Sequence, residues 1–126
     1  MSKMDSNETL DKFGQFIILN LRDNAIDFFD KLIAGVNKAN KLQRLQDNLM
    51  PFSSEEKEFV RKCLVAGIDT AIHDFLLALM ENYSSKKDVE VIVNGENIVP
   101  LSKALYKELP TKDGWFARFS RYQIEF

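Results

Sequence analysis

The sequence has few of the residues on which most enzymes and metalloproteins depend. It contains one histidine, His73, and one cysteine, Cys63, among 126 residues. Structural zinc sites need several such ligands, and an intramolecular disulfide needs two cysteines. The five glycines are scattered, and neither a glycine-rich phosphate loop nor a Gly-x-Ser-x-Gly motif is present. We therefore expect no cofactor, no metal site and no catalytic residue, although His73 leaves an enzymatic role open.

The chain also lacks a strong charge bias and a long apolar run. Lysine and arginine number 17 and aspartate and glutamate 19, so the net charge of -2 favours neither nucleic acid nor an acidic membrane. No stretch reaches the ~20 consecutive apolar residues of a membrane span, and the first residues lack the basic start and apolar core of a signal peptide. The unpaired cysteine is typical of a reducing compartment. We expect a cytoplasmic protein that does not bind membranes.

The sequence is rich in apolar residues, which make up 45% of the chain, and many of them are three or four positions apart. That spacing is typical of amphipathic helices, and the length suits a single domain over residues 1–126. In the first helix, Leu21, Phe28 and Leu32 fall in the apolar stripe. Three helices are predicted, over residues 8–36, 38–48 and 54–83.

The third predicted helix is the most informative one. Ser53 and Glu56 form a capping-box pattern at its start. From Cys63 to Met80 its apolar side chains point in nearly every direction, which predicts a central helix that is buried on all sides, with Cys63 in the core. Gly67 lies in its middle, where glycine costs roughly 1 kcal/mol relative to alanine. We expect a close neighbour there, most simply another helix.

The pattern changes after residue 88. Alternating valines over residues 89–93 lead into Asn94 and Gly95, the strongest short signal for a β-hairpin. A two-turn helix is predicted over residues 101–109, and the aromatic-rich segment 115–126 is predicted as a further strand. The predicted fold class is α+β: a three-helix N-terminal bundle with a central buried helix, packed on a small C-terminal antiparallel β-sheet.

One candidate binding site lies on the third helix. Asp69 and His73 are four residues apart, so the carboxylate can orient the imidazole, and Asp74 lies beside it. Trp115 or Tyr122 could supply an aromatic wall to a pocket between this helix and the sheet. These five residues would suit a small-molecule-binding protein or a minor enzyme. The simpler interpretation is that the polar side chains satisfy one another inside the fold.

A second candidate site lies on the first helix. Asp23, Asp27 and Asp30 fall opposite the apolar stripe, and Phe16 and Leu19 lie near that polar side. An acidic surface with apolar anchors could attract and hold a basic protein. Ten phenylalanines and an apolar central helix also favour self-association as a homodimer. Binding of single-stranded nucleic acid by the arginines and aromatics of residues 115–121 is a weaker alternative.

Three stretches resemble a group of small uncharacterised bacterial proteins of about this length. They are residues 67–79 (GIDTAIHDFLLAL), 93–97 (VNGEN) and 113–122 (DGWFARFSRY). The resemblance implies a compact domain and assigns no activity or site residue. In size and charge the chain is also similar to bacterial toxin-immunity proteins, which is an analogy without a shared motif. The function we predict is a non-enzymatic protein–protein interaction module, an inhibitor or immunity-type partner of another bacterial protein.

Overall fold

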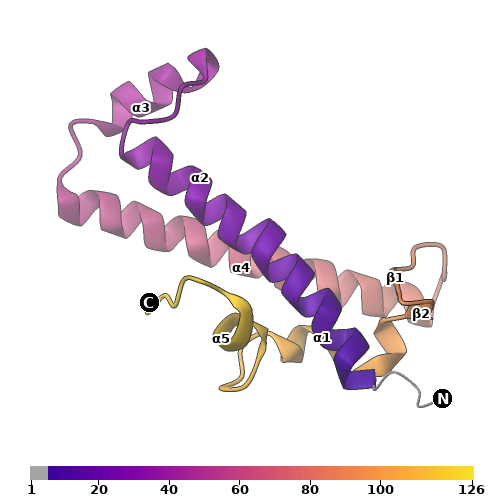
Figure 1. Cartoon of the computed structure of the whole chain (residues 1–126). Coiled ribbons are helices and arrows are strands. Elements are labelled where there is room, and N and C mark those ends of the chain that lie inside the picture. The colour runs from indigo at the N-terminus through magenta and orange to yellow at the C-terminus, as the bar shows by residue number, and fades with distance from the viewer. Residues whose placement is uncertain (1–5) are drawn as a thin grey trace.

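The structure, a computed structural model, describes residues 6–126. These residues are 67% helical and include a two-stranded antiparallel sheet, so the α+β prediction is confirmed at this level. Figure 1 shows a long helical rod that crosses a second long helix, with the C-terminal segments beside both. The elements are α1 (Ser6–Ile17), η1 (Ile18–Asp23), α2 (Asn24–Ile33), η2 (Asn40–Leu42), α3 (Gln43–Leu49), α4 (Ser54–Ser84), β1 (Ile92–Val93), β2 (Glu96–Asn97), η3 (Val99–Leu101), η4 (Leu105–Glu108) and α5 (Trp115–Phe119).

The rod formed by α1, η1 and α2 contains a π-helical segment, η1. Each π-turn holds one residue more than an α-turn, so the side chains that follow it are rotated around the axis. As a result, Arg22, Asp23 and Ile26 are buried, whereas Leu21 and Phe28 are 52% and 46% exposed. The predicted apolar stripe through Leu21 and Phe28 is therefore wrong, because it assumed an unbroken α-helix.

Helix α4 begins where the sequence predicts. The Ser53 hydroxyl accepts a hydrogen bond from the Glu56 backbone N–H at 3.0 Å, and the Glu56 carboxylate accepts one from the Ser53 N–H at 2.8 Å. This is the complete capping box. The Ser53 backbone N–H also holds the pKa of Glu56 below its usual value. From this cap the helix continues for 31 residues.

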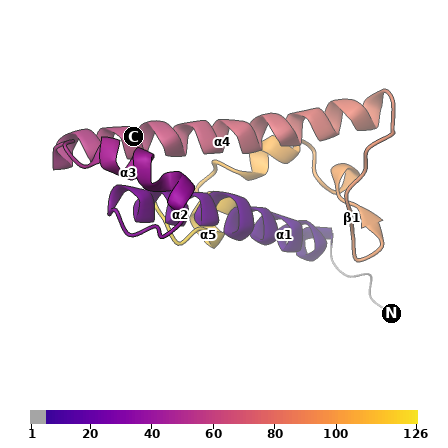
Figure 2. The same cartoon turned by 90° about the horizontal axis from the view of Figure 1, so that it is seen from above.

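Helix α4 is covered on one side. Figure 2 shows it along one edge of the molecule, with α1, α2 and α5 all on the same side of it. Cys63 is exposed, and a Cβ atom built at Gly67 would meet nothing within 4 Å. The predictions of burial on all sides, of Cys63 in the core and of a close neighbour at Gly67 are therefore wrong for a single chain. The buried residues of α4 are Val65, Ile72, Leu76 and Leu79.

The C-terminal third contains the predicted hairpin and no further strand among the described residues. Strands β1 and β2 pair antiparallel, with Asn94 and Gly95 at φ values of 52° and 81° in the turn. The predicted helix over residues 101–109 is replaced by two 3₁₀ turns: η3, which contains Pro100, and η4, which ends before Pro110. The strand predicted for residues 115–126 is wrong. Its first part forms α5, because Trp115 packs into the core on one helical face.

The core lies where α1, α4 and the C-terminal segments meet. Trp115 is fully buried at its centre, and its ring packs edge-on against Phe13 with 5.9 Å between the centroids. Gly14 permits this approach, because a Cβ at that position would lie 2.3 Å from the indole. A residue with a side chain at position 14 is thus incompatible with the observed position of α5.

Candidate functional site

The carboxylates of the predicted acidic face form hydrogen bonds and ion pairs with other residues of the same chain. Asp23 is fully buried, and its carboxylate accepts hydrogen bonds from the Ser120 hydroxyl at 2.6 Å and the Arg121 backbone N–H at 2.8 Å. Asp27 accepts hydrogen bonds from the Arg121 guanidinium at 2.6 Å and from the Tyr122 hydroxyl. The prediction that Asp23 is exposed is therefore wrong, because the π-turn rotates it inward.

These contacts also change proton affinities. The hydrogen bond from Tyr122, and after it the one from Arg121, lowers the pKa of Asp27. The same hydrogen bond raises the pKa of Tyr122. Asp30 forms a separate pair with Arg61 at 2.7 Å, which raises the pKa of the guanidinium. The three aspartates thus hold other parts of the chain in place.

Arg22 is the centre of this network. It is 3% exposed, and its guanidinium donates two hydrogen bonds to Asp69, at 2.6 and 3.2 Å. It also donates to the Ser120 hydroxyl at 2.7 Å and to the Tyr122 carbonyl at 2.8 Å, and it lies 4.7 Å from the centroid of the Phe116 ring. A buried charge needs such partners. Asp69, which is predicted to bind a ligand, instead forms a salt bridge with Arg22.

The residues around His73 form a small hollow of about 250 Å³. The His73 ring packs against Tyr106 with 4.9 Å between centroids, and its Nδ1 lies 3.0 Å from the Asp74 carboxylate. Trp115 and Tyr122 are not part of this hollow, since Trp115 is in the core and Tyr122 contacts Asp27. The lining residues are Asp69, Thr70, His73, Tyr106, Leu109, Pro110 and Phe116.

Two aromatic side chains at this hollow, those of Tyr106 and Phe116, are not predicted from the sequence. Tyr106 comes from η4 and Phe116 from α5, the two segments whose local structure was predicted wrongly. No motif marks either residue, and their approach to α4 depends on tertiary packing. Among residues 6–126, no group of three or more His, Cys, Asp or Glu side chains could hold a metal ion.

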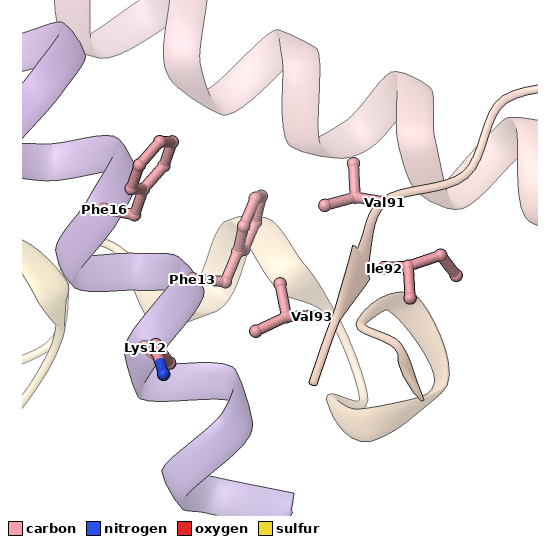
Figure 3. A pocket seen from close by; sticks show the side chains of 6 residues that line it. All are labelled: Lys12, Phe13, Phe16, Val91, Ile92 and Val93. Carbon is pink, nitrogen blue, oxygen red and sulfur yellow. The ribbon is translucent and has the colours of Figure 1, made fainter. Parts of the chain in front are cut away.

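An apolar groove lies between α1 and β1. Figure 3 shows Val91 and Val93 pointing toward α1, where Phe13 and Phe16 face them, while Ile92 points the other way. The groove has a volume of about 320 Å³, and Lys12 supplies its positive charge. Phe16 is 67% exposed, and Leu19, the second predicted anchor, is half-buried outside this lining. We call this surface the α1–β1 groove.

Comparisons of the chain with models of known protein families, with curated proteins and with solved structures found no match. The function is therefore argued from the surfaces described above. Two of these can receive a ligand: the hollow beside His73 and the α1–β1 groove. The groove is lined almost entirely by apolar side chains and the hollow by a mixture of polar and aromatic ones.

Proposed function

We propose that the chain is a non-enzymatic protein-binding module, an inhibitor or immunity-type partner of another bacterial protein in the cytoplasm. The observation that carries the proposal is the exposure of Phe16, 67%, at an apolar groove. A large, solvent-exposed aromatic side chain beside an apolar groove is typical of the anchor residues of protein interfaces. This keeps Phe16 as an interface residue and moves the interface from the acidic face to the α1–β1 groove.

The groove also specifies the chemistry of the partner. Because Asp27 and Asp30 already pair with Arg121 and Arg61, the acidic face offers few free carboxylates to attract a basic protein. Binding at the groove would instead be stabilised by burial of apolar surface, at about 25 cal/mol per Å². The partner segment that fits is apolar and carries a carboxylate that can pair with Lys12.

Affinity purification from the host, followed by native mass spectrometry, tests this proposal. We expect the wild-type protein to retain a second polypeptide at fixed stoichiometry, and Phe16→Ser to lose it. Phe28→Ser is the matched control, since Phe28 is 46% exposed on the same rod but lies outside the groove. Thermal unfolding of each variant confirms that it folds. Equal retention by both variants, or no retained polypeptide with the wild type, would contradict the proposal.

A second candidate function is the binding of a small molecule in the hollow beside His73. It is favoured by the packing of Tyr106 on His73 at a concave surface that also contains Thr70. The volume of about 250 Å³ lies just below the usual range of ligand pockets, roughly 300–1,000 Å³, so the ligand would be small. A small retained mass that His73→Ala removes and Phe16→Ser does not would support this function.

A further inference from the structure

The outward side of α4 is largely apolar, and no other part of the described chain covers it. An 18-residue stretch of this helix is strongly apolar, yet only 22% of that stretch is buried. By length and composition alone α4 could cross a membrane, and here its side away from the rod faces solvent. We call this surface the outer face. Its exposed small and apolar residues include Cys63, Ala66, Gly67, Ala71, Phe75 and Ala78.

We propose that a second copy of this chain covers the outer face, with the two α4 helices antiparallel and a twofold axis beside Ala71. The outer face is separate from the α1–β1 groove, so this inference does not depend on the proposed function. In the pair, α4 would reach the central, covered position that its composition predicts. Three properties of the helix support this arrangement.

The first property is that a bulky side chain of one copy would lie opposite a glycine of the other. Gly67 and Phe75 each lie four residues from Ala71, on opposite sides. An antiparallel pair centred on Ala71 therefore brings the Phe75 ring of one copy level with Gly67 of the other. Phe75 is 46% exposed, and the space outside Gly67 is open. Glycine destabilises a helix interior by about 1 kcal/mol relative to alanine. In the pair, Gly67 would provide the room that the ring needs.

The second property is the distribution of charge along the helix. Glu55 in the first turn and Lys87 after the last turn each lie sixteen residues from Ala71. Glu56 and Lys86 each lie fifteen residues from it. The antiparallel pair therefore brings Glu55 and Glu56 of each copy level with Lys87 and Lys86 of the other, two lysines that follow a last helical turn without a basic residue. A parallel pair would bring acidic residues together, and its helix dipoles would also repel.

The third property is the position of the polar side chains within the outer face. Thr70 lies one residue before Ala71 and Asp74 three residues after it. Across an antiparallel pair, the Thr70 hydroxyl of one copy comes close to the Asp74 carboxylate of the other and can donate a hydrogen bond to it. Lipid tails cannot donate a hydrogen bond to Asp74, and a charged residue in the middle of a membrane-spanning helix is unfavourable. A protein surface is therefore favoured over a lipid one.

Analytical ultracentrifugation tests whether the pair exists. We expect the wild-type protein to sediment at twice the mass of one chain. Ala71→Arg should raise the dissociation constant by about 100-fold or more, because two guanidinium groups would face each other across the axis. The matched control is Ala34→Arg, at an exposed alanine at the end of α2. Since Ala71 is also exposed, both variants should fold, which circular dichroism checks.

Disulfide formation tests the orientation. In a Cys63→Ser background, Ala71→Cys would place the two thiols opposite each other at the axis. Ala78→Cys would place them about 21 Å apart along the helix, at 1.5 Å per residue. We expect Ala71→Cys to form a cross-linked dimer on oxidation and Ala78→Cys to remain uncrosslinked. Equal cross-linking at both positions would show a parallel pair and overturn the proposal.

Two other results would also overturn it. One is a wild-type protein that stays monomeric at high concentration. The other is a monomer that sediments with phosphatidylcholine vesicles, with binding lost in Ala71→Arg, since lipid would then cover the outer face. The dimer is distinguishable from the proposed function. Phe16→Ser should leave the dimer intact, and Ala71→Arg should leave the capture of a partner protein intact.

Discussion

Arg22 and Asp69 lie 47 residues apart in the sequence and are joined by two hydrogen bonds, of 2.6 and 3.2 Å. The arginine belongs to the π-helical segment η1 and the aspartate to α4. The same guanidinium also donates to Ser120 and Tyr122. A single buried cation thus connects the helical rod, the long helix and the C-terminal segment.

Removal of the Asp69 carboxylate should destabilise the fold strongly. Asp69→Ala leaves the Arg22 charge buried without its main partner, and we expect a loss of about 3 kcal/mol in the free energy of unfolding. Asp47→Ala is the control, because Asp47 is exposed and accepts a hydrogen bond from the Gln43 side chain at the surface, far from Arg22 in the sequence. Urea denaturation measures both variants. A loss below about 1 kcal/mol for Asp69→Ala would show that the pair matters little.

The contact between Asp27 and Tyr122 should make the fold sensitive to acid. The pKa of Asp27 in the folded protein lies below its usual value of 3.8, so the unfolded chain binds the proton more readily. Its contribution to stability is therefore present above about pH 4 and is lost as the pH falls further. We expect Asp27→Asn to be less stable than the wild type near neutral pH, with the difference shrinking on acidification. Chemical denaturation at several pH values measures this, and a pH-independent difference would contradict it.

Two glycines of the long helices should respond oppositely to alanine. Gly14→Ala should destabilise the protein by about 1–3 kcal/mol, because the added Cβ would collide with the buried Trp115 ring. Gly67→Ala meets no neighbour within one chain and should stabilise the helix by up to about 1 kcal/mol. Thermal unfolding under conditions that keep the protein monomeric measures both. Similar effects of the two substitutions would argue against the observed position of α5.

The capping box at α4 should also contribute measurably. Ser53→Ala removes the hydroxyl that accepts the Glu56 N–H, and we expect a loss of about 1 kcal/mol. Ser54→Ala is the control, because Ser54 is the first residue of the helix rather than its cap. The measurement is the midpoint of thermal unfolding, and equal changes in both variants would contradict a specific role for Ser53.

The sequence predicts those features of the fold that depend on neighbouring residues. The Ser53–Glu56 cap and the Asn94–Gly95 turn are both where the pattern places them, because each is stabilised by contacts within a few residues. Burial around the rod could not be predicted in the same way. A π-turn shifts which residues face inward by one position, and the hydrogen bonds of Asp23 and Arg22 to distant residues accompany it.

For the same reason, the candidate sites are predicted correctly only where their residues are close in the sequence. Asp69 and His73 share one side of a helix and both line the hollow, whereas Asp74, which the sequence groups with them, is not among its lining residues. Trp115 and Tyr122 were expected at the same place, but one fills the core and the other contacts Asp27. The aromatic residues that do reach the hollow come from short turns whose position depends on the whole fold. Phe16 was predicted near the polar side, and it is exposed.

The way Arg22 is bound has a consequence for how the protein opens. The Arg121 amide is held by Asp23, next to a guanidinium that already links α4 to the C-terminal segment. Release of that segment would expose hydrogen-bonding groups of both Asp23 and Arg22 that are otherwise satisfied. Local unfolding of the C-terminal segment is therefore coupled to separation of the rod from α4. The Arg121 amide should exchange its hydrogen with solvent about as slowly as amides in the middle of α4, as part of one cooperative unit.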